Sequence, residues 1–239
     1  MQWLVSILLI VGGSFFESYP NDVRQAIEFL SHHRELKEEL GQHLTEEETL
    51  MAMAIVAPEL SQFSKYEDKV QTRIMARMYV QQGRGNFSIG YFQMKPSFAE
   101  QIERVVAVDE RLKKEYKELI TKEKRRGKED ERKREERYDR LERLASLGWQ
   151  TKYLSAFVAI VREWTKDIEF ETDEEKVRYW ATLYNAGIYR KPADIEKLQK
   201  VKQFPHWGRG YNYAAVAVEF YNHFKKEGLW KEKENNDDR

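Results

Sequence analysis

One glutamate of this sequence is placed where a carboxyl group can do acid–base chemistry. Glu59 follows the apolar stretch "MAMAIVAP", which predicts a helix that ends near this glutamate. An apolar setting and a helix C-terminus both disfavour a negative charge, so we expect the pKa of Glu59 to be raised. A carboxyl group that is still protonated near neutral pH can donate to the leaving oxygen of a glycosidic bond. The alternative is an ordinary surface glutamate after a helix-ending proline.

A second carboxylate would be needed if a water molecule attacked the sugar directly, as in an inverting hydrolase. Glu67 and Asp68 follow Glu59 by eight and nine residues. Nothing in their surroundings separates them from solvated surface residues, which is the interpretation that we favour. Inverting hydrolysis therefore stays open as an alternative.

The stretch "GNFSIGYFQMKPSFAEQ", from Gly85 to Gln101, contains residues suited to binding a saccharide. Its glycines would let the backbone approach a ligand closely. Ser88 and Gln93 would supply polar contacts, and the aromatic pair between them would supply apolar surface. The alternative is a tight turn whose aromatic side chains belong to the core. The proline at position 96 predicts a helix over 96–106 after the loop.

The elements that must position these residues are predicted to be helices. Apolar residues recur at helical spacing from Pro20 to Gly41. Thr45 and Glu48 are spaced as a capping box in front of the apolar helix. We find no convincing alternating strand pattern and no hairpin turn dipeptide. The sequence therefore predicts an all-α fold.

The composition limits the classes of function. The 239 residues carry 41 basic and 41 acidic side chains, so the neutral net charge does not favour nucleic-acid binding. No cysteine is present, which excludes disulfides and thiolate metal sites. The five histidines lack metal-ligand spacing, and no phosphate-binding loop occurs. We expect no metal and no cofactor.

The N-terminal segment, residues 1–17, contains an apolar run from Trp3 to Val11. Its length suits the hydrophobic region of a signal peptide and is short for a membrane span. No basic residue precedes the run and no A-x-A pattern follows it, so a buried first helix is the alternative. We expect export to the periplasm or cell envelope.

A charged segment at about 109–147 interrupts the apolar pattern. Its few apolar positions, among them Leu112, Tyr116 and Leu119, are spaced by three and four residues. This spacing predicts a narrowly amphipathic helical hairpin that turns near Gly127 and projects into solvent. A dedicated partner-binding arm is the alternative, and association with a membrane or an envelope protein, through this hairpin or the N-terminus, stays open.

Three short motifs, in order, resemble those of the soluble, lysozyme-like family of lytic transglycosylases. They are "PEL" at 58–60, "GYFQM" at 90–94 and "YNAG" at 184–187, and the "NY" of a later helix, at 212–213, also matches. The resemblance covers roughly residues 50–221, interrupted by the charged segment. It implies a lysozyme-like helical domain over residues 18–239.

The resemblance also implies a reaction and a set of site residues. The reaction is cleavage of the β-1,4 bond between N-acetylmuramic acid and N-acetylglucosamine in peptidoglycan glycan strands, with 1,6-anhydromuramyl ends as product. Glu59 would act first as acid and then as base, and a hydrogen bond from Tyr184 would orient it. The implied substrate contacts are Ser88, Gly90, Tyr91, Phe92, Gln93, Met94, Tyr184, Asn185 and Tyr213. Leu60 stands where the family has serine, so a non-catalytic glycan-binding or scaffold protein of the envelope is a second hypothesis.

Overall fold

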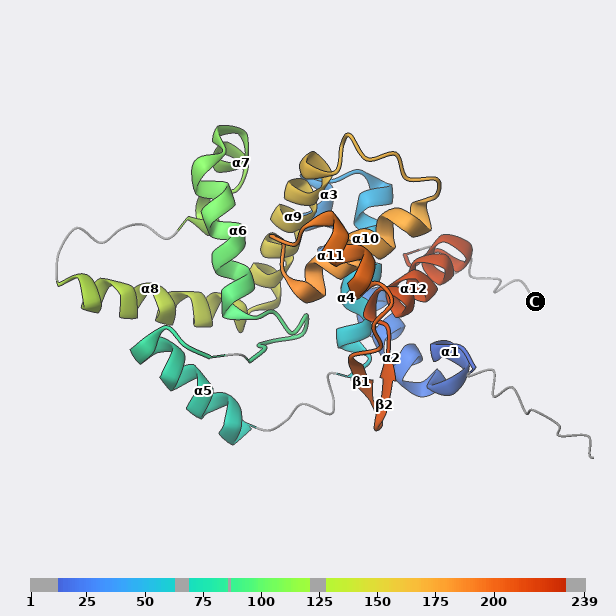
Figure 1. Ribbon diagram of the computed structural model, residues 1–239, viewed down its shortest axis with the longest axis horizontal. Coiled ribbons are helices and arrows are strands. Elements are labelled where there is room, and N and C mark those ends of the chain that lie inside the picture. Colours follow the sequence, from blue (N-terminus) through green and yellow to red (C-terminus); the bar gives the residue numbers. More distant parts are fainter. Residues whose placement is uncertain (1–12, 63–68, 86, 121–127, 231–239) are drawn as a thin grey trace, which may run out of the picture.

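The protein is built almost entirely of helices, which confirms the predicted all-α class (Figure 1). The computed structural model describes residues 13–62, 69–85, 87–120 and 128–230. The elements, in chain order, are α1 (Phe15–Ser18), α2 (Pro20–His32), α3 (Glu35–Gly41), α4 (Glu46–Leu60), α5 (Lys69–Gln82), α6 (Pro96–Val108), α7 (Glu110–Glu115), a short 3₁₀ helix (Lys117–Leu119), α8 (Glu129–Leu144), α9 (Leu147–Trp164), α10 (Asp173–Ala186), α11 (Pro192–Leu198), β1 (Phe204–His206), β2 (Arg209–Tyr211) and α12 (Tyr213–Glu227).

Helix α4 forms the centre of the fold. Every residue from Met51 to Pro58 is buried, as expected for a helix that is apolar on all sides. The predicted capping box begins it: Glu48 N–H donates to Thr45 Oγ1 at 3.2 Å, and Thr45 N–H donates to Glu48 Oε2 at 3.0 Å. Helices α2, α3, α9, α10 and α12 pack around α4. Helix α4, which carries Glu59, is therefore held by most of the fold.

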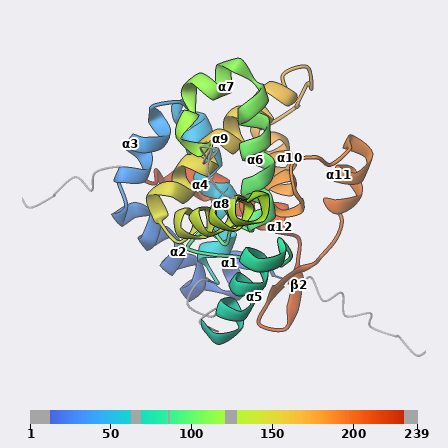
Figure 2. The ribbon, with the colours of Figure 1, turned by 90° about the vertical axis from the view of Figure 1, so that its left-hand side faces the viewer.

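The second buried helix is α9, whose residues 153–161 are all enclosed. It contacts α4 on one side and α6 on the other, so it joins the central helices to the group formed by α5, α6, α7 and α8. In Figures 1 and 2 this group forms one side of the molecule. Helix α6 begins at the predicted Pro96 and ends at Val108.

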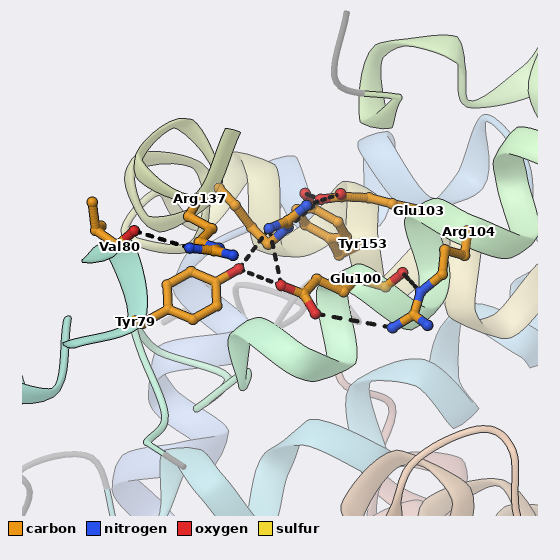
Figure 3. A network of polar contacts seen from close by, with 8 residues as sticks. Tyr79, Val80, Glu100, Glu103, Arg104, Arg137 and Tyr153 are labelled. Carbon is orange, nitrogen blue, oxygen red and sulfur yellow. Dashed lines mark hydrogen bonds and ion pairs between the residues drawn. The ribbon is translucent and has the colours of Figure 1, made fainter. Parts of the chain in front are cut away.

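A buried polar network holds α8 against α6 (Figure 3). Arg140 of α8 binds the Glu103 carboxylate through two nitrogens, at 2.9 and 2.5 Å. Tyr153 of α9 donates to the same carboxylate at 2.6 Å, and Tyr79 of α5 donates to Glu100 at 2.6 Å. Both Arg140 and Glu103 are 8% exposed. Because a buried charge is tolerated only when it is paired, this network fixes the position of α8.

The charged segment was predicted to be a helical hairpin that projects into solvent. This prediction is wrong for the first and last parts of the segment, which pack against the core. Its first half is the short α7 and the 3₁₀ helix, and the side chains of Leu112, Tyr116, Leu119 and Leu144 are buried in the main core. One apolar side chain in each of these helical turns faces the core, and these few side chains are sufficient to anchor the segment. The turn predicted near Gly127 lies outside the described residues.

The folded part of the chain begins before the expected boundary at residue 18. Phe15 is 1% exposed and packs edge-on against Tyr211 with ring centroids 5.3 Å apart. The N–H groups of Phe15 and Phe16 donate to the Glu219 carboxylate at 3.2 and 3.1 Å. Helix α1 therefore belongs to the domain, whereas the apolar run 3–11 lies outside the described residues. No helix in the described part of the chain is both long and apolar enough to cross a membrane.

A two-stranded hairpin, β1 and β2, is the feature of the fold that the sequence analysis missed. The strands pair antiparallel, with Phe204 opposite Tyr211. The two-residue turn is Trp207 and Gly208, with φ of 48° and 76°. Positive φ at both positions is the conformation of a type I′ hairpin turn, and a tryptophan is an uncommon residue for its first position.

Candidate functional site

A cleft of about 280 Å³ lies where the end of α4, the loop before α6, the start of α6 and the end of α10 meet. These segments are far apart in the sequence. Of the residues selected from the sequence, the cleft brings together Glu59, Ser88, Gln93, Met94, Tyr184 and Asn185. It is also lined by Lys95, Ser97, Phe98, Gln101, Ala186, Gly187 and Arg190, which the sequence analysis did not select as contacts.

Glu59 is the carboxylic acid of the described cleft, and its acidity is altered. Burial raises its pKa from the usual 4.5 to about 8, against an opposing effect of the nearby Lys95 ammonium group. Within the described residues no side chain is hydrogen-bonded or ion-paired to its carboxylate, so desolvation is not offset. At pH 7 the protonated form of Glu59 is therefore favoured. Glu59 is also the one acidic residue among the described residues that line the cleft.

The last turn of α4, which carries Glu59, is supported from outside the helix. Pro58 lies within that turn and has no N–H to donate to the helix. Tyr213, at the start of α12, donates its hydroxyl to the Ile55 carbonyl at 2.8 Å and is 3% exposed. Tyr213 therefore holds α4 at Ile55, one helical turn before Glu59. It does not line the cleft, which differs from its expected role as a substrate contact.

The loop from Ile89 to Met94 closes on itself as a tight turn. The two end residues exchange backbone hydrogen bonds of 3.0 and 3.1 Å. Gly90 has φ of 71° and Gln93 has φ of 47°, both in the region that favours glycine. The Gln93 amide donates to the Gly90 carbonyl at 2.7 Å, which stabilises this conformation and fixes the side chain at the cleft wall.

Gln150 of α9, which the sequence analysis missed, holds this loop in place. Its Nε2 donates to the carbonyls of Ile89, at 2.8 Å, and Leu144, and its Oε1 accepts from Phe92 N–H at 2.8 Å. A Cβ atom at Gly90 would lie 1.7 Å from this Nε2. Gly90 therefore serves close packing rather than contact with a ligand. A glutamine within the apolar stretch of α9 was the signal, because buried polar side chains require partners.

Tyr184 reaches the cleft from α10, but its hydroxyl has a different partner from the one expected. It donates to the Phe92 carbonyl at 2.7 Å, so the expected hydrogen bond from Tyr184 to Glu59 is corrected. The pKa of Tyr184 is raised well above 10.0, first by burial and second by the proximity of Glu59. The hydroxyl proton is thus retained and joins α10 to the loop.

The aromatic pair of the loop faces the core rather than the cleft. Phe92 is fully buried. Tyr91 packs against Phe29 of α2, with ring centroids 4.9 Å apart. Neither ring lines the cleft, so the expectation that they provide apolar surface for a saccharide is wrong. Phe98, at the start of α6, provides such surface instead.

The turn after α10 forms another part of the cleft wall. Gly187 ends the helix with φ of 98°, and the Ile188 N–H donates to Gln101 Oε1 at 3.0 Å. This hydrogen bond ties the turn to α6. Asn185 is exposed and lines the cleft, where its amide is accessible to a ligand.

A larger open depression of about 590 Å³ lies between α9 and α10, lined by residues from Arg162 to Lys176. In this depression the pKa of Asp173 is lowered, chiefly because the Lys225 ammonium group donates a hydrogen bond to its carboxylate. A lowered pKa suits an ion pair and not a proton donor. The described residues include no cluster of acidic and histidine side chains that could hold a metal ion.

Comparison with known proteins gives no match. No family model, no curated protein and no solved structure is similar to this chain. Glu67 and Asp68, the alternative second carboxylates, lie outside the described residues.

Proposed function

We propose that the protein is an exported enzyme of the periplasm or cell envelope that cleaves peptidoglycan glycan strands as a lytic transglycosylase. The observation that carries this proposal is the carboxyl group of Glu59, which has a pKa of about 8 in a cleft lined by polar side chains. A neutral carboxyl group in such a setting is what protonation of a glycosidic oxygen requires. The order of the three motifs, described above, supports the choice of substrate.

The reaction divides into two proton transfers through one residue. Glu59 donates its proton to the oxygen that links the muramyl C1 to the next sugar, and the C1–O bond breaks as the muramyl acetamido group assists. The resulting carboxylate then accepts the proton of the muramyl 6-hydroxyl, whose oxygen bonds to C1. Glu59 ends protonated, as it began, and no water is consumed. A single carboxyl group with a pKa near 8 suits both steps.

The rest of the cleft would bind and orient the saccharide. Ser88, Gln93 and Asn185 present polar groups to it, and Phe98 presents apolar surface. A largely pre-formed pocket with a few polar groups that fix the orientation of the ligand is typical of small-molecule sites. The hydrogen bond from Tyr184 to the loop keeps two of these walls at a constant separation.

The test is digestion of purified peptidoglycan with separation of the fragments by mass. Wild-type products should end in anhydromuramyl residues, which are lighter by one water than hydrolysis products. Glu59→Gln should reduce the rate by roughly 10²–10⁴-fold, whereas the exposed Glu28→Gln on α2 serves as the matched control. Full activity of Glu59→Gln would contradict the proposal. Reducing muramyl ends, with inactivation by Asp68→Asn, would instead support an inverting lysozyme-type hydrolase.

A non-catalytic glycan-binding or scaffold protein of the envelope is the second candidate. One observation favours it: the Tyr184 hydroxyl donates to a backbone carbonyl instead of orienting Glu59. An undirected carboxyl group donates its proton less effectively. Binding of glycan strands without any change in their mass would support this candidate.

A further inference from the structure

The cleft contains two basic side chains that the proposed reaction does not use. Lys95 lies at the N-cap of α6 and is half-buried, and Arg190 follows the turn after α10 and is exposed. Both line the same cavity as Glu59. The Arg190 Nε donates to the Ala186 carbonyl at 2.9 Å, which holds the guanidinium group at the cleft rim.

Neither cation has a carboxylate partner within the described part of the chain, although such partners are frequent elsewhere. Arg140 is paired with Glu103, and Lys225 is paired with Asp173 at 2.7 Å. The one acidic side chain of the described cleft is Glu59, and its raised pKa favours the neutral form at pH 7. The cleft is thus positively charged in a molecule whose net charge is zero.

We propose that this cleft selects glycan segments that carry a carboxylate beside the bond to be cleaved, and that Lys95 and Arg190 bind that carboxylate. This inference rests on the proposed function. Charge-assisted hydrogen bonds to a carboxylate are among the strong polar contacts of proteins. Two sources of the carboxylate exist on the same polymer: the lactyl group of the muramyl sugar when it is unsubstituted, and the free carboxylates of a peptide stem.

The size of the cleft supports contact with a substituent near the scissile bond. Its volume of about 280 Å³ is at the lower end of ligand sites, so it encloses a short part of a glycan strand. The two cations come from different segments of the lining, Lys95 from the N-cap of α6 and Arg190 from the residues after α10. A carboxylate held by both would fix the position of the sugar relative to Glu59, and a neutral strand would lack this restraint.

The experiment measures binding of three synthetic tetrasaccharides of alternating N-acetylglucosamine and N-acetylmuramic acid by calorimetry. One has free lactyl carboxylates, one has lactyl methylamides, and one has amide-linked stem peptides with free carboxylates. The protein is the Glu59→Gln variant, so that no substrate is consumed. We expect at least one carboxylate form to bind about tenfold more tightly than the methylamide, and the form that does so identifies the source.

Two further variants are made in the Glu59→Gln protein. The test variant adds Lys95→Gln and Arg190→Gln, and the control variant adds Lys113→Gln and Lys133→Gln. The second pair lies exposed on α7 and α8, away from the cleft, and changes the net charge equally. The first pair should abolish the tenfold preference, and the second pair should keep it. Arg190→Gln alone, at an exposed position, should reduce the preference and provides a readout if the pair impairs folding.

Three results would overturn the inference: equal binding of all three tetrasaccharides, absence of binding, or a preference that survives loss of both cleft cations. Cleavage assays with the wild-type protein distinguish failure of this inference from failure of the proposed function. Equal kcat/KM for carboxylate and methylamide substrates would leave the lytic reaction intact and refute the selectivity. A carboxylate preference without any cleavage would refute the reaction and keep the selectivity of binding.

Discussion

Replacing Glu59 with glutamine should make the protein more stable at alkaline pH. In the folded protein burial raises the pKa of Glu59 to about 8, whereas an unfolded chain gives it the usual 4.5. Between these two values the folded state keeps the proton and the unfolded state releases it. The wild-type free energy of unfolding therefore falls, relative to the variant, by about 1.4 kcal/mol per pH unit. The difference reaches up to about 5 kcal/mol above pH 8.

The assay is chemical unfolding of both proteins at steps from pH 4.5 to pH 9. Near pH 4.5 the two should be nearly equal in stability, because a protonated glutamate and a glutamine have similar shape. By pH 8 the variant should unfold at the higher denaturant concentration. Glu28→Gln removes one exposed carboxylate of α2 and serves as the control. A difference between wild type and variant that stays constant across this range would refute the reasoning, because Glu59 would then titrate as it does in the unfolded chain.

Two further predictions concern the supports of the cleft, and a third concerns the buried pair of Arg140 and Glu103. Gln150→Leu should lower the free energy of unfolding by about 3 kcal/mol, because it leaves the buried Phe92 N–H and Leu144 carbonyl without this partner. Gly90→Ala should destabilise by about 2 kcal/mol, since its Cβ would collide with Gln150; denaturant midpoints unchanged in both would contradict the role of this contact. Arg140→Met should lower the stability by about 3–5 kcal/mol, since Glu103 would keep a buried, unpaired charge. Adding Glu103→Gln to Arg140→Met should restore much of the loss, and a double variant as unstable as the single one would show that packing, not charge, is decisive.

Local sequence signals predicted the elements that depend on neighbouring residues. The capping box of Thr45 and Glu48 begins α4, and Pro96 begins α6, because both effects act within one helical turn. The position of Glu59 at the end of an apolar helix was predicted in the same way. Its burial, and hence its raised pKa, followed from the apolar residues that precede it.

Contacts between distant segments could not be predicted from periodicity. The Tyr184 hydroxyl donates its hydrogen bond to a carbonyl 92 residues away, and no local pattern distinguishes that partner from Glu59. The charged segment was expected to lie in solvent because its polar residues outnumber its apolar ones. Burial depends on which face meets the core, and the Arg140 pair with Glu103 allows even a charged face to be enclosed.

The assembly of the cleft from distant segments gives a way to search for ligands without knowing the reaction. Its walls come from α4, the loop at 88–95 and the end of α10, and they separate when the chain unfolds. Any molecule that fills the cleft binds the native state alone, and at a hundred times its Kd would raise the free energy of unfolding by about 2.7 kcal/mol. A screen of saccharide fragments by melting temperature would detect such molecules, including those that the protein binds but does not cleave.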